Sequence, residues 1–98
     1  MGSSQLGERI KMLRERQNLF LRHVATALKM DTAQLSKIEN GQRVLNRKHI
    51  PALARILKAN ADELMTLWLA DQIYEVVNVG DFAQAKEALN IVSNNLKK

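Results

Sequence analysis

The sequence contains no cysteine, a single proline and few aromatic residues among its 98 positions. The absence of cysteine excludes disulfide bonds, thiol catalysis and cysteine-ligated zinc. The two histidines, His23 and His49, cannot build a structural metal site alone, and neither has a second ligand nearby. We therefore expect solvent-facing or capping histidines, no metal or cofactor, and a fold that only packing holds together.

Long apolar runs are also absent. No stretch of about 18 apolar residues is present to span a membrane, and no charged and then apolar leader precedes a cleavage site. The opening Met1-Gly2-Ser3-Ser4 resembles an expression-vector remnant. The acidic residues form no paired, pocket-like arrangement that would supply a general acid or base. We expect a cytoplasmic protein that is not an enzyme and has no membrane partner.

The positive charge is unevenly distributed along the chain. Residues 1–60 hold twelve lysines and arginines against four acidic residues, whereas residues 61–98 hold three against six. The basic character therefore belongs to one part of the fold. This asymmetry favours a polyanionic partner for the first part, although a solvated basic face without a partner would give the same count.

Apolar residues spaced three or four apart, without sustained alternation, predict an all-α protein. The successive apolar stripes begin at Leu6, Val24, Leu35, Ile50, Leu64 and Phe82. Capping-box spacing marks three of the helix starts, at Asp31, Asn60 and Asp81.

Three further positions predict where helices end or begin. Gly41 supplies a left-handed residue that would end the third helix. Asn46 is a candidate cap for the fourth helix, and Pro51 within its first turn predicts a 3₁₀-like or shifted start. The fifth helix is predicted to run to about Val77, and Gly80 separates it from the sixth.

Residues 21–40 have the pattern of a helix-turn-helix. Ala25 is the small residue where two short helices would touch, and Leu35 and Ile38 would anchor the second helix on the core. The outward side chains suit the major groove, because Gln34 can pair with adenine and Lys37 can donate to guanine. The candidate base contacts are Thr32, Ala33, Gln34, Ser36 and Lys37. The candidate phosphate contacts are Arg22, Asn40, Gln42, Arg43, Arg47 and Lys48.

The run Leu35-Ser36-Lys37-Ile38-Glu39-Asn40-Gly41 resembles the XRE-like family of helix-turn-helix transcription regulators, the phage repressor and Cro type. The resemblance extends to residues 6–10, 52–57 and 62–64, and so covers about the first two-thirds of the chain. It implies a five-helix, lambda-repressor-like domain that binds double-stranded DNA as a dimer. It also implies a buried ion pair, which falls on Arg14 and Glu39.

The chain departs from the family pattern at two places. Phe20 and Leu21 stand where members usually carry a polar cap and a DNA-contacting glutamine, so that contact does not carry over. Lys29 stands where the turn usually has glycine, and a left-handed lysine there would cost roughly 1 kcal/mol.

The C-terminal part carries more apolar stripe than a five-helix domain needs. We expect a DNA-binding domain at residues 1–68 and a helical extension at residues 69–98, whose sixth helix serves dimerisation. The alternative is a sixth helix that folds back to complete the monomer core. The predicted dimer interface comprises Leu69, Ile73, Val76, Val77, Phe82, Leu89, Val92 and Leu96.

These features predict a bacterial or phage transcription regulator, foremost a repressor, that reads a palindromic operator and associates with the nucleoid. Regulation of its own gene is a further option. A homodimer would read two half-sites about 34 Å apart, or a multiple of that distance. Two alternatives stay open. One is an antitoxin-like module that binds a protein partner through its C-terminal helices, and the other is the controller of a restriction-modification locus.

Overall fold

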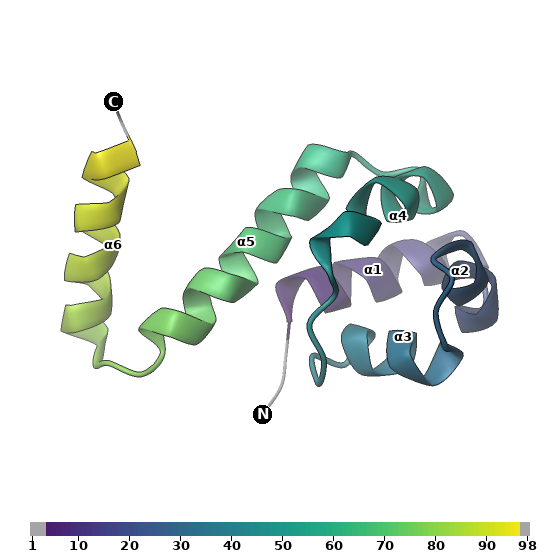
Figure 1. Ribbon diagram of the computed structural model, residues 1–98, viewed down its shortest axis with the longest axis horizontal. Helices are drawn as coiled ribbons and strands as arrows, with labels where there is room; N and C mark the ends of the chain where they lie inside the picture. The colour runs from purple at the N-terminus through teal and green to yellow at the C-terminus, as the bar shows by residue number, and fades with distance from the viewer. Residues whose placement is uncertain (1–3, 97–98) are drawn as a thin grey trace.

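The computed structural model describes residues 4–96, and helices without any strand make up this part of the chain (Figure 1). The elements in order are α1 Gln5–Arg16, α2 Leu21–Ala27, α3 Thr32–Glu39, the 3₁₀ helix η1 Arg47–His49, α4 Ile50–Leu57, α5 Ala61–Val77 and α6 Phe82–Leu96. The all-α prediction is confirmed. The 3₁₀-like start before α4 is also as predicted, with Pro51 in the first turn of α4.

Side-chain caps fix some helix starts but not the start of α3. Asn60 accepts a hydrogen bond from the backbone N–H of Glu63 at 3.1 Å. Asp81 and Gln84 exchange both bonds of a capping box. The predicted box at Asp31 is wrong, because its side chain makes no capping bond. Asp31 is exposed, so water can satisfy the first N–H groups of α3.

Left-handed residues shape the turns on either side of α3. Gly41 has a φ of 78° directly after the C-cap of α3, where the sequence predicts the end of this helix. Lys29 has a φ of 57° in the turn between α2 and α3. A lysine in this conformation carries a strain of roughly 1 kcal/mol, which the packing of both helices offsets.

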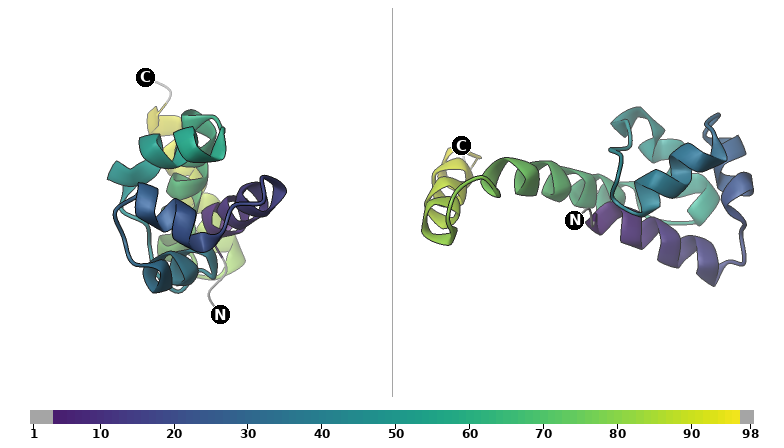
Figure 2. Two further views of the ribbon diagram at one scale, coloured as in Figure 1. Left: turned by 90° about the vertical axis from the view of Figure 1, so that its right-hand side faces the viewer. Right: turned by 90° about the horizontal axis from the view of Figure 1, so that it is seen from below.

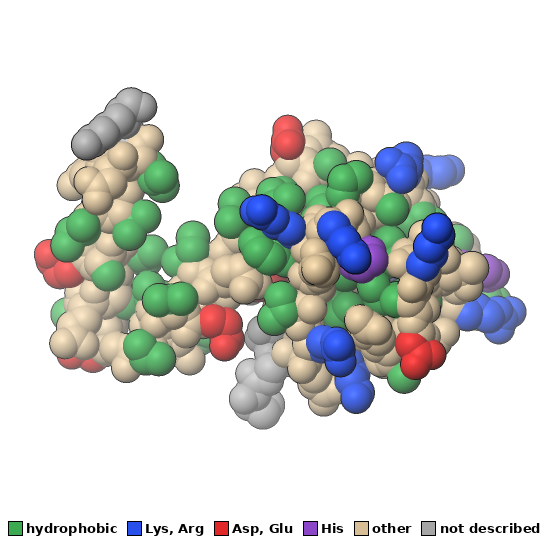
Figure 3. All heavy atoms as spheres, viewed as in Figure 1, with side chains coloured by type: hydrophobic (Ala, Val, Ile, Leu, Met, Phe, Trp, Pro, Cys, Tyr) green, Lys and Arg blue, Asp and Glu red, His purple; other side chains and the backbone are tan. Residues whose placement is uncertain are grey.

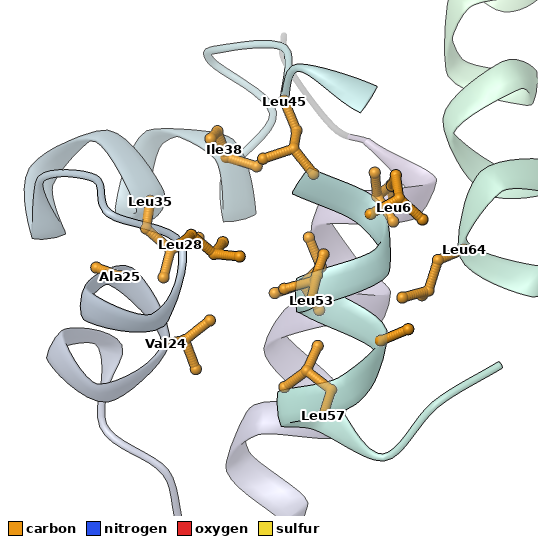
Figure 4. Packing of buried hydrophobic residues seen from close by; sticks show 13 residues of the cluster. Leu6, Val24, Ala25, Leu28, Leu35, Ile38, Leu45, Leu53, Leu57 and Leu64 are labelled. Carbon is orange, nitrogen blue, oxygen red and sulfur yellow. The ribbon is translucent and has the colours of Figure 1, made fainter. Parts of the chain in front are cut away.

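The hydrophobic core joins the first five α-helices (Figure 4). Leu28 and Leu35 meet between α2 and α3, and Leu64 points from α5 toward the other helices. Each fully buried leucine of this kind contributes about 1.5–3 kcal/mol relative to an exposed one. After Leu64, no residue up to Leu96 is buried, so the core lies entirely in the first two-thirds of the chain.

We call α1 to α4 with residues 61–68 the head, and residues 69–96 the tail. The tail projects from the head, and α6 stands apart from α1 to α4 in Figure 1 and in the right-hand view of Figure 2. The radius of gyration is 15.0 Å, above the roughly 13 Å of a compact chain of this length. No residue of α6 is buried, so α6 does not fold back to complete the core.

The carboxylate of Asp71 ties the tail to the start of α1. It accepts hydrogen bonds from Ser4 Oγ at 2.7 Å, from the N–H of Gln5 at 2.9 Å and from the N–H of Leu6 at 3.1 Å. The negative charge also complements the positive end of the helix dipole. The helix α5 runs without a break across residue 68. The Asp71 contacts keep its next turn attached to α1. Ser4 itself caps α1, whereas the other residues of the apparent vector remnant, 1–3, lie outside the described part.

Candidate nucleic-acid interface

The helix α3 is anchored by one face and leaves the other on the surface. Leu35 and Ile38 are buried in the core, and Ala25 of α2 is buried beside them. In the view from below, α3 lies at the front of the head, nearest to the viewer (Figure 2, right). Of the candidate base contacts, Thr32, Ala33 and Lys37 are exposed, while Gln34 and Ser36 are half-buried. The structure thus places all five on one short helix, three of them freely accessible.

A close approach of backbones sets the position of the C-terminal end of α3. A Cβ atom at Gly7 would lie 2.5 Å from the carbonyl oxygen of Ile38 and 2.7 Å from that of Glu39. Real Cβ atoms essentially never come so near to backbone oxygen. Glycine at this position of α1 therefore allows α3 to pack directly against the helix.

The ion pair of Arg14 and Glu39 joins the same two helices. Arg14 donates from Nε to Glu39 Oε2 at 2.7 Å and from Nη2 to Oε1 at 3.1 Å, and from Nη1 to the carbonyl of Leu19 at 2.9 Å. The side chains of Arg14 and Glu39 are 12% and 4% exposed, respectively. The hydrogen bond to Glu39 raises the pKa of Arg14 above its ordinary value and outweighs the opposing effect of burial. The bidentate pair fixes α3 against α1. The bond to Leu19 fixes the turn before α2 against the same helix.

A basic segment, residues 42–48, follows α3. Gln42, Arg43, Arg47 and Lys48 are all exposed, while Leu45 between them is buried and anchors the segment. A hollow beside α3 is lined by side chains of this segment together with Gln34 and Trp68. The candidate phosphate contacts Arg43, Arg47 and Lys48 therefore lie around one depression next to α3. Asn40, at the C-cap of α3, is exposed as well.

Arg22 lies apart from this segment, on the first turn of α2. Its guanidinium carbon is 4.8 Å from the ring centre of Phe20, which is a cation–π contact. His23 accepts a hydrogen bond at Nδ1 from the backbone N–H of Phe20 at 3.2 Å. His23 thus acts as a capping histidine in the manner of the third residue of a capping box, while Phe20 offers no side-chain acceptor to the first N–H groups of α2.

Charge separates the head from the tail on the surface. Lys and Arg side chains are spread over the visible face of the head, whereas the tail shows mainly hydrophobic and acidic side chains (Figure 3). Within residues 4–96, no three histidine or acidic side chains come together in a way that would hold a metal ion.

Two polar contacts that hold the helices of the head together are not predicted by the sequence. The indole Nε1 of Trp68 donates to the carbonyl oxygen of Leu45 at 2.7 Å. Gln17 Nε2, at the end of α1, donates to the carbonyl of Leu57 at the end of α4. A tryptophan that is partly buried needs a partner for its N–H, which is a signal in the sequence. That signal does not reveal which distant carbonyl is the partner.

A family model described as a helix-turn-helix domain matches residues 5–67. The chain belongs to the XRE/Cro-like type of this helix-turn-helix family. The match begins with α1 and ends inside α5, so it covers nearly the whole head and leaves the tail outside. No curated protein and no solved structure matches the chain significantly. None of the helices between residues 4 and 96 of this helix-turn-helix protein has the length and apolar character that crossing a membrane requires.

Proposed function

We propose that this helix-turn-helix protein is a sequence-specific transcription regulator, acting as a repressor, that reads DNA with α3 in the major groove. One observation carries the proposal. The buried side chains of Leu35 and Ile38 and the Arg14–Glu39 pair hold α3 rigidly, while Thr32, Ala33 and Lys37 face the solvent. A rigid helix with short or hydrogen-bonding side chains outward is what base readout requires.

The two groups of polar residues have different roles in this proposal. Gln34 and Lys37 would read adenine and guanine edges, with Thr32 and Ala33 against thymine methyl groups and Ser36 as a further hydrogen-bonding contact. Arg43, Arg47 and Lys48 around the hollow beside α3 would bind the phosphates, supported by Asn40 and Gln42. Arg22, held over the Phe20 ring, would bind a phosphate at the other end of the motif.

We further propose that residues 69–98 pair two copies of residues 1–68. α5 has two faces, because Leu64, Trp68 and Asp71 point to the head while Leu69, Ile73, Val76 and Val77 lie on the opposite side of the helix. A groove between this opposite side and α6 is lined by Gln72, Ile73, Val76, Val77, Ala88, Leu89 and Val92. Phe82 and Leu96 extend its apolar surface along α6, where they are 78% exposed.

A continuous apolar surface between the end of α5 and α6, outside the core of the head, favours burial against a partner. A second copy is the occupant we propose, since a twofold dimer would present two basic heads to two half-sites of a palindromic operator. The exposure of the tail also supports a second candidate, an antitoxin-like protein whose tail binds another protein while its head binds DNA.

The test is binding to a palindromic DNA from the upstream region of its own gene, measured by mobility shift at several salt concentrations. We expect binding that weakens steeply with salt, and loss of sequence preference when Thr32, Gln34 and Lys37 are all changed to alanine. Lys86→Ala, which removes a cation from α6 in the tail, is the control and should bind like the parent. A parent protein without sequence preference would overturn the proposal, and an unaffected triple variant would exclude α3 as the reading helix.

A further inference from the structure

Trp68 connects α5 to the basic segment that follows α3. Its half-buried side chain donates the indole hydrogen bond to the carbonyl oxygen of Leu45 at 2.7 Å, across 23 positions in the sequence. The Leu45 side chain is 2% exposed, so the same residue is held by packing and by its backbone. The contact therefore fixes the middle of the segment that carries Arg43 and Arg47.

The two ends of the segment are fixed locally. The N–H of Gln42 donates to the carbonyl of Lys37 at 2.8 Å, next to the left-handed Gly41. Asn46 Oδ1 accepts from the N–H of Lys48 at 3.0 Å and so caps η1. Within residues 4–96, the bond from Trp68 is the one hydrogen bond that reaches residues 43–45.

Trp68 also lies between two hollows of the head. One is the basic hollow that contains Arg43, Arg47 and Lys48, and the other is lined by Asp71, Tyr74 and Glu75 of α5 together with residues 41–45. Asp71, one turn further along α5, holds the start of α1. The helix α5 thus ties both α1 and the basic segment to a single rigid element.

We infer that Trp68 is a positioning residue for DNA binding, which holds Arg43 and Arg47 in the geometry that phosphate contact requires. The inference rests on the proposed function. A segment that is already ordered loses little conformational entropy on binding. A segment without its central anchor binds more weakly, because ordering both arginines on the DNA costs entropy and the less well held one no longer stays on its phosphate. Trp68 therefore acts through Leu45 and the two arginines and needs no contact with DNA of its own.

Trp68→Phe tests the inference, because phenylalanine keeps an aromatic ring on the core and removes the donor. On a random-sequence DNA duplex we expect the dissociation constant to rise roughly fivefold, the size of effect that the net contribution of one hydrogen bond gives. We also expect the slope of log K against log salt to become shallower by about one, as for one lost phosphate contact. The NMR backbone order parameters of residues 43–46 should fall relative to those of the core helices in the free protein.

Leu67→Ala is the matched control. Leu67 is the neighbour of Trp68 on α5 and is also partly buried, but it lines a hollow beside α1 with Gln5, Arg9 and Glu63 instead of the basic segment. This variant should lose stability without any change in the salt slope or in the relative order parameters of residues 43–46. If Leu67→Ala changed the slope as much as Trp68→Phe, the effect would be general destabilisation and the inference would be wrong.

The test separates this inference from the proposed function. A parent protein that fails to bind the duplex overturns both. A parent that binds with a steep salt dependence, together with a Trp68→Phe variant of equal affinity and equal slope, overturns the positioning role alone.

Discussion

The guanidinium of Arg14 and the carboxylate of Glu39 form two hydrogen bonds of 2.7 and 3.1 Å, which join α1 to the last residue of α3. Both side chains are largely shielded from solvent. The third hydrogen bond of Arg14, to the carbonyl of Leu19, extends the connection to the turn before α2. One charged pair thus sets how α3 sits on the rest of the head.

Glu39→Ala should lower the free energy of unfolding by about 3 kcal/mol or more, because it leaves the Arg14 charge buried without its carboxylate. Urea titration followed by circular dichroism gives this value. Glu63→Ala is the control, since it breaks the exposed Arg9–Glu63 pair, whose side chains are 37% and 46% exposed. That change should cost less than about 1 kcal/mol. Equal costs for both variants would contradict a special role of the buried pair.

The contribution of Arg14 to the free energy of unfolding should stay constant between pH 7 and about pH 10. The hydrogen bond to Glu39 raises the pKa of Arg14. A base with a raised pKa in the folded state stabilises the fold fully below its unfolded pKa, and this contribution is lost only as pH rises through the folded value. Both pKa values lie well above the pH range in which proteins are ordinarily handled. The difference in unfolding free energy between the parent and Glu39→Gln should therefore stay constant from pH 7 to about pH 10, and a steady decline in this range would count against the assignment.

Gly7→Ala should destabilise the head by about 1–3 kcal/mol, because the added Cβ meets the backbone oxygens of Ile38 and Glu39 and forces α1 away from α3. Gly80→Ala provides the comparison. There the added Cβ would meet only the Gln84 side chain, with Oε1 at 3.0 Å. A shift of this side chain disturbs only the cap of α6, which lies outside the core, so the melting temperature should hardly change. A Gly7→Ala variant as stable as Gly80→Ala would show that α1 and α3 are not packed this closely in solution.

Arg43→Ala should weaken DNA binding almost equally for all sequences and lower the magnitude of the salt slope by about one, because the arginine is proposed to contact phosphate. Lys37→Ala should instead weaken binding mainly to the preferred sequence, by about 1–3 kcal/mol if the lysine reads a base. Competition between operator and random DNA separates the two effects. Identical changes in specificity for both variants would invalidate the division into base and phosphate contacts.

Leu89→Asp should convert the proposed dimer into a monomer, because the aspartate would place a charge in the groove that Ile73, Val76 and Val92 line with it. Ile91→Asp is the matched control on the same helix. Ile91 is 60% exposed and lies on the side of α6 opposite Leu89, so its substitution should leave the assembly intact. Sedimentation equilibrium measures the outcome. A parent protein that sediments as a monomer, or a tail that captures a different protein stoichiometrically, would exclude the homodimer.

Much of the local structure was predictable because neighbouring residues encode it. The capping box of Asp81 and Gln84 formed as expected, since both partners lie within one helical turn. Gly41 adopted the left-handed conformation that ends α3. The box at Asp31 failed because spacing specifies which residues are within reach, and not which rotamer an exposed side chain adopts.

The candidate site was predictable to a different extent for each residue. Periodicity separated the buried Leu35 and Ile38 from the exposed Thr32 and Lys37, but it did not show that Gln34 and Ser36 are half-buried. The helical spacing of Trp68 from Leu64 places it on the apolar side of α5 but gives no sign that its N–H holds the carbonyl of Leu45. Contacts of this kind depend on where two distant segments meet in space.

The sequence by itself determined that the chain is helical, where its helices end, and which face of α3 is apolar, because each of these properties depends on residues within a few positions of one another. Tertiary structure alone decided that Asp71 caps α1, that Trp68 anchors the basic segment, and that α6 stands away from the core. A hydrogen-bond donor or an apolar stripe can be read from the chain. Its partner is selected by the packing of whole helices, which brings together residues that are far apart in the sequence.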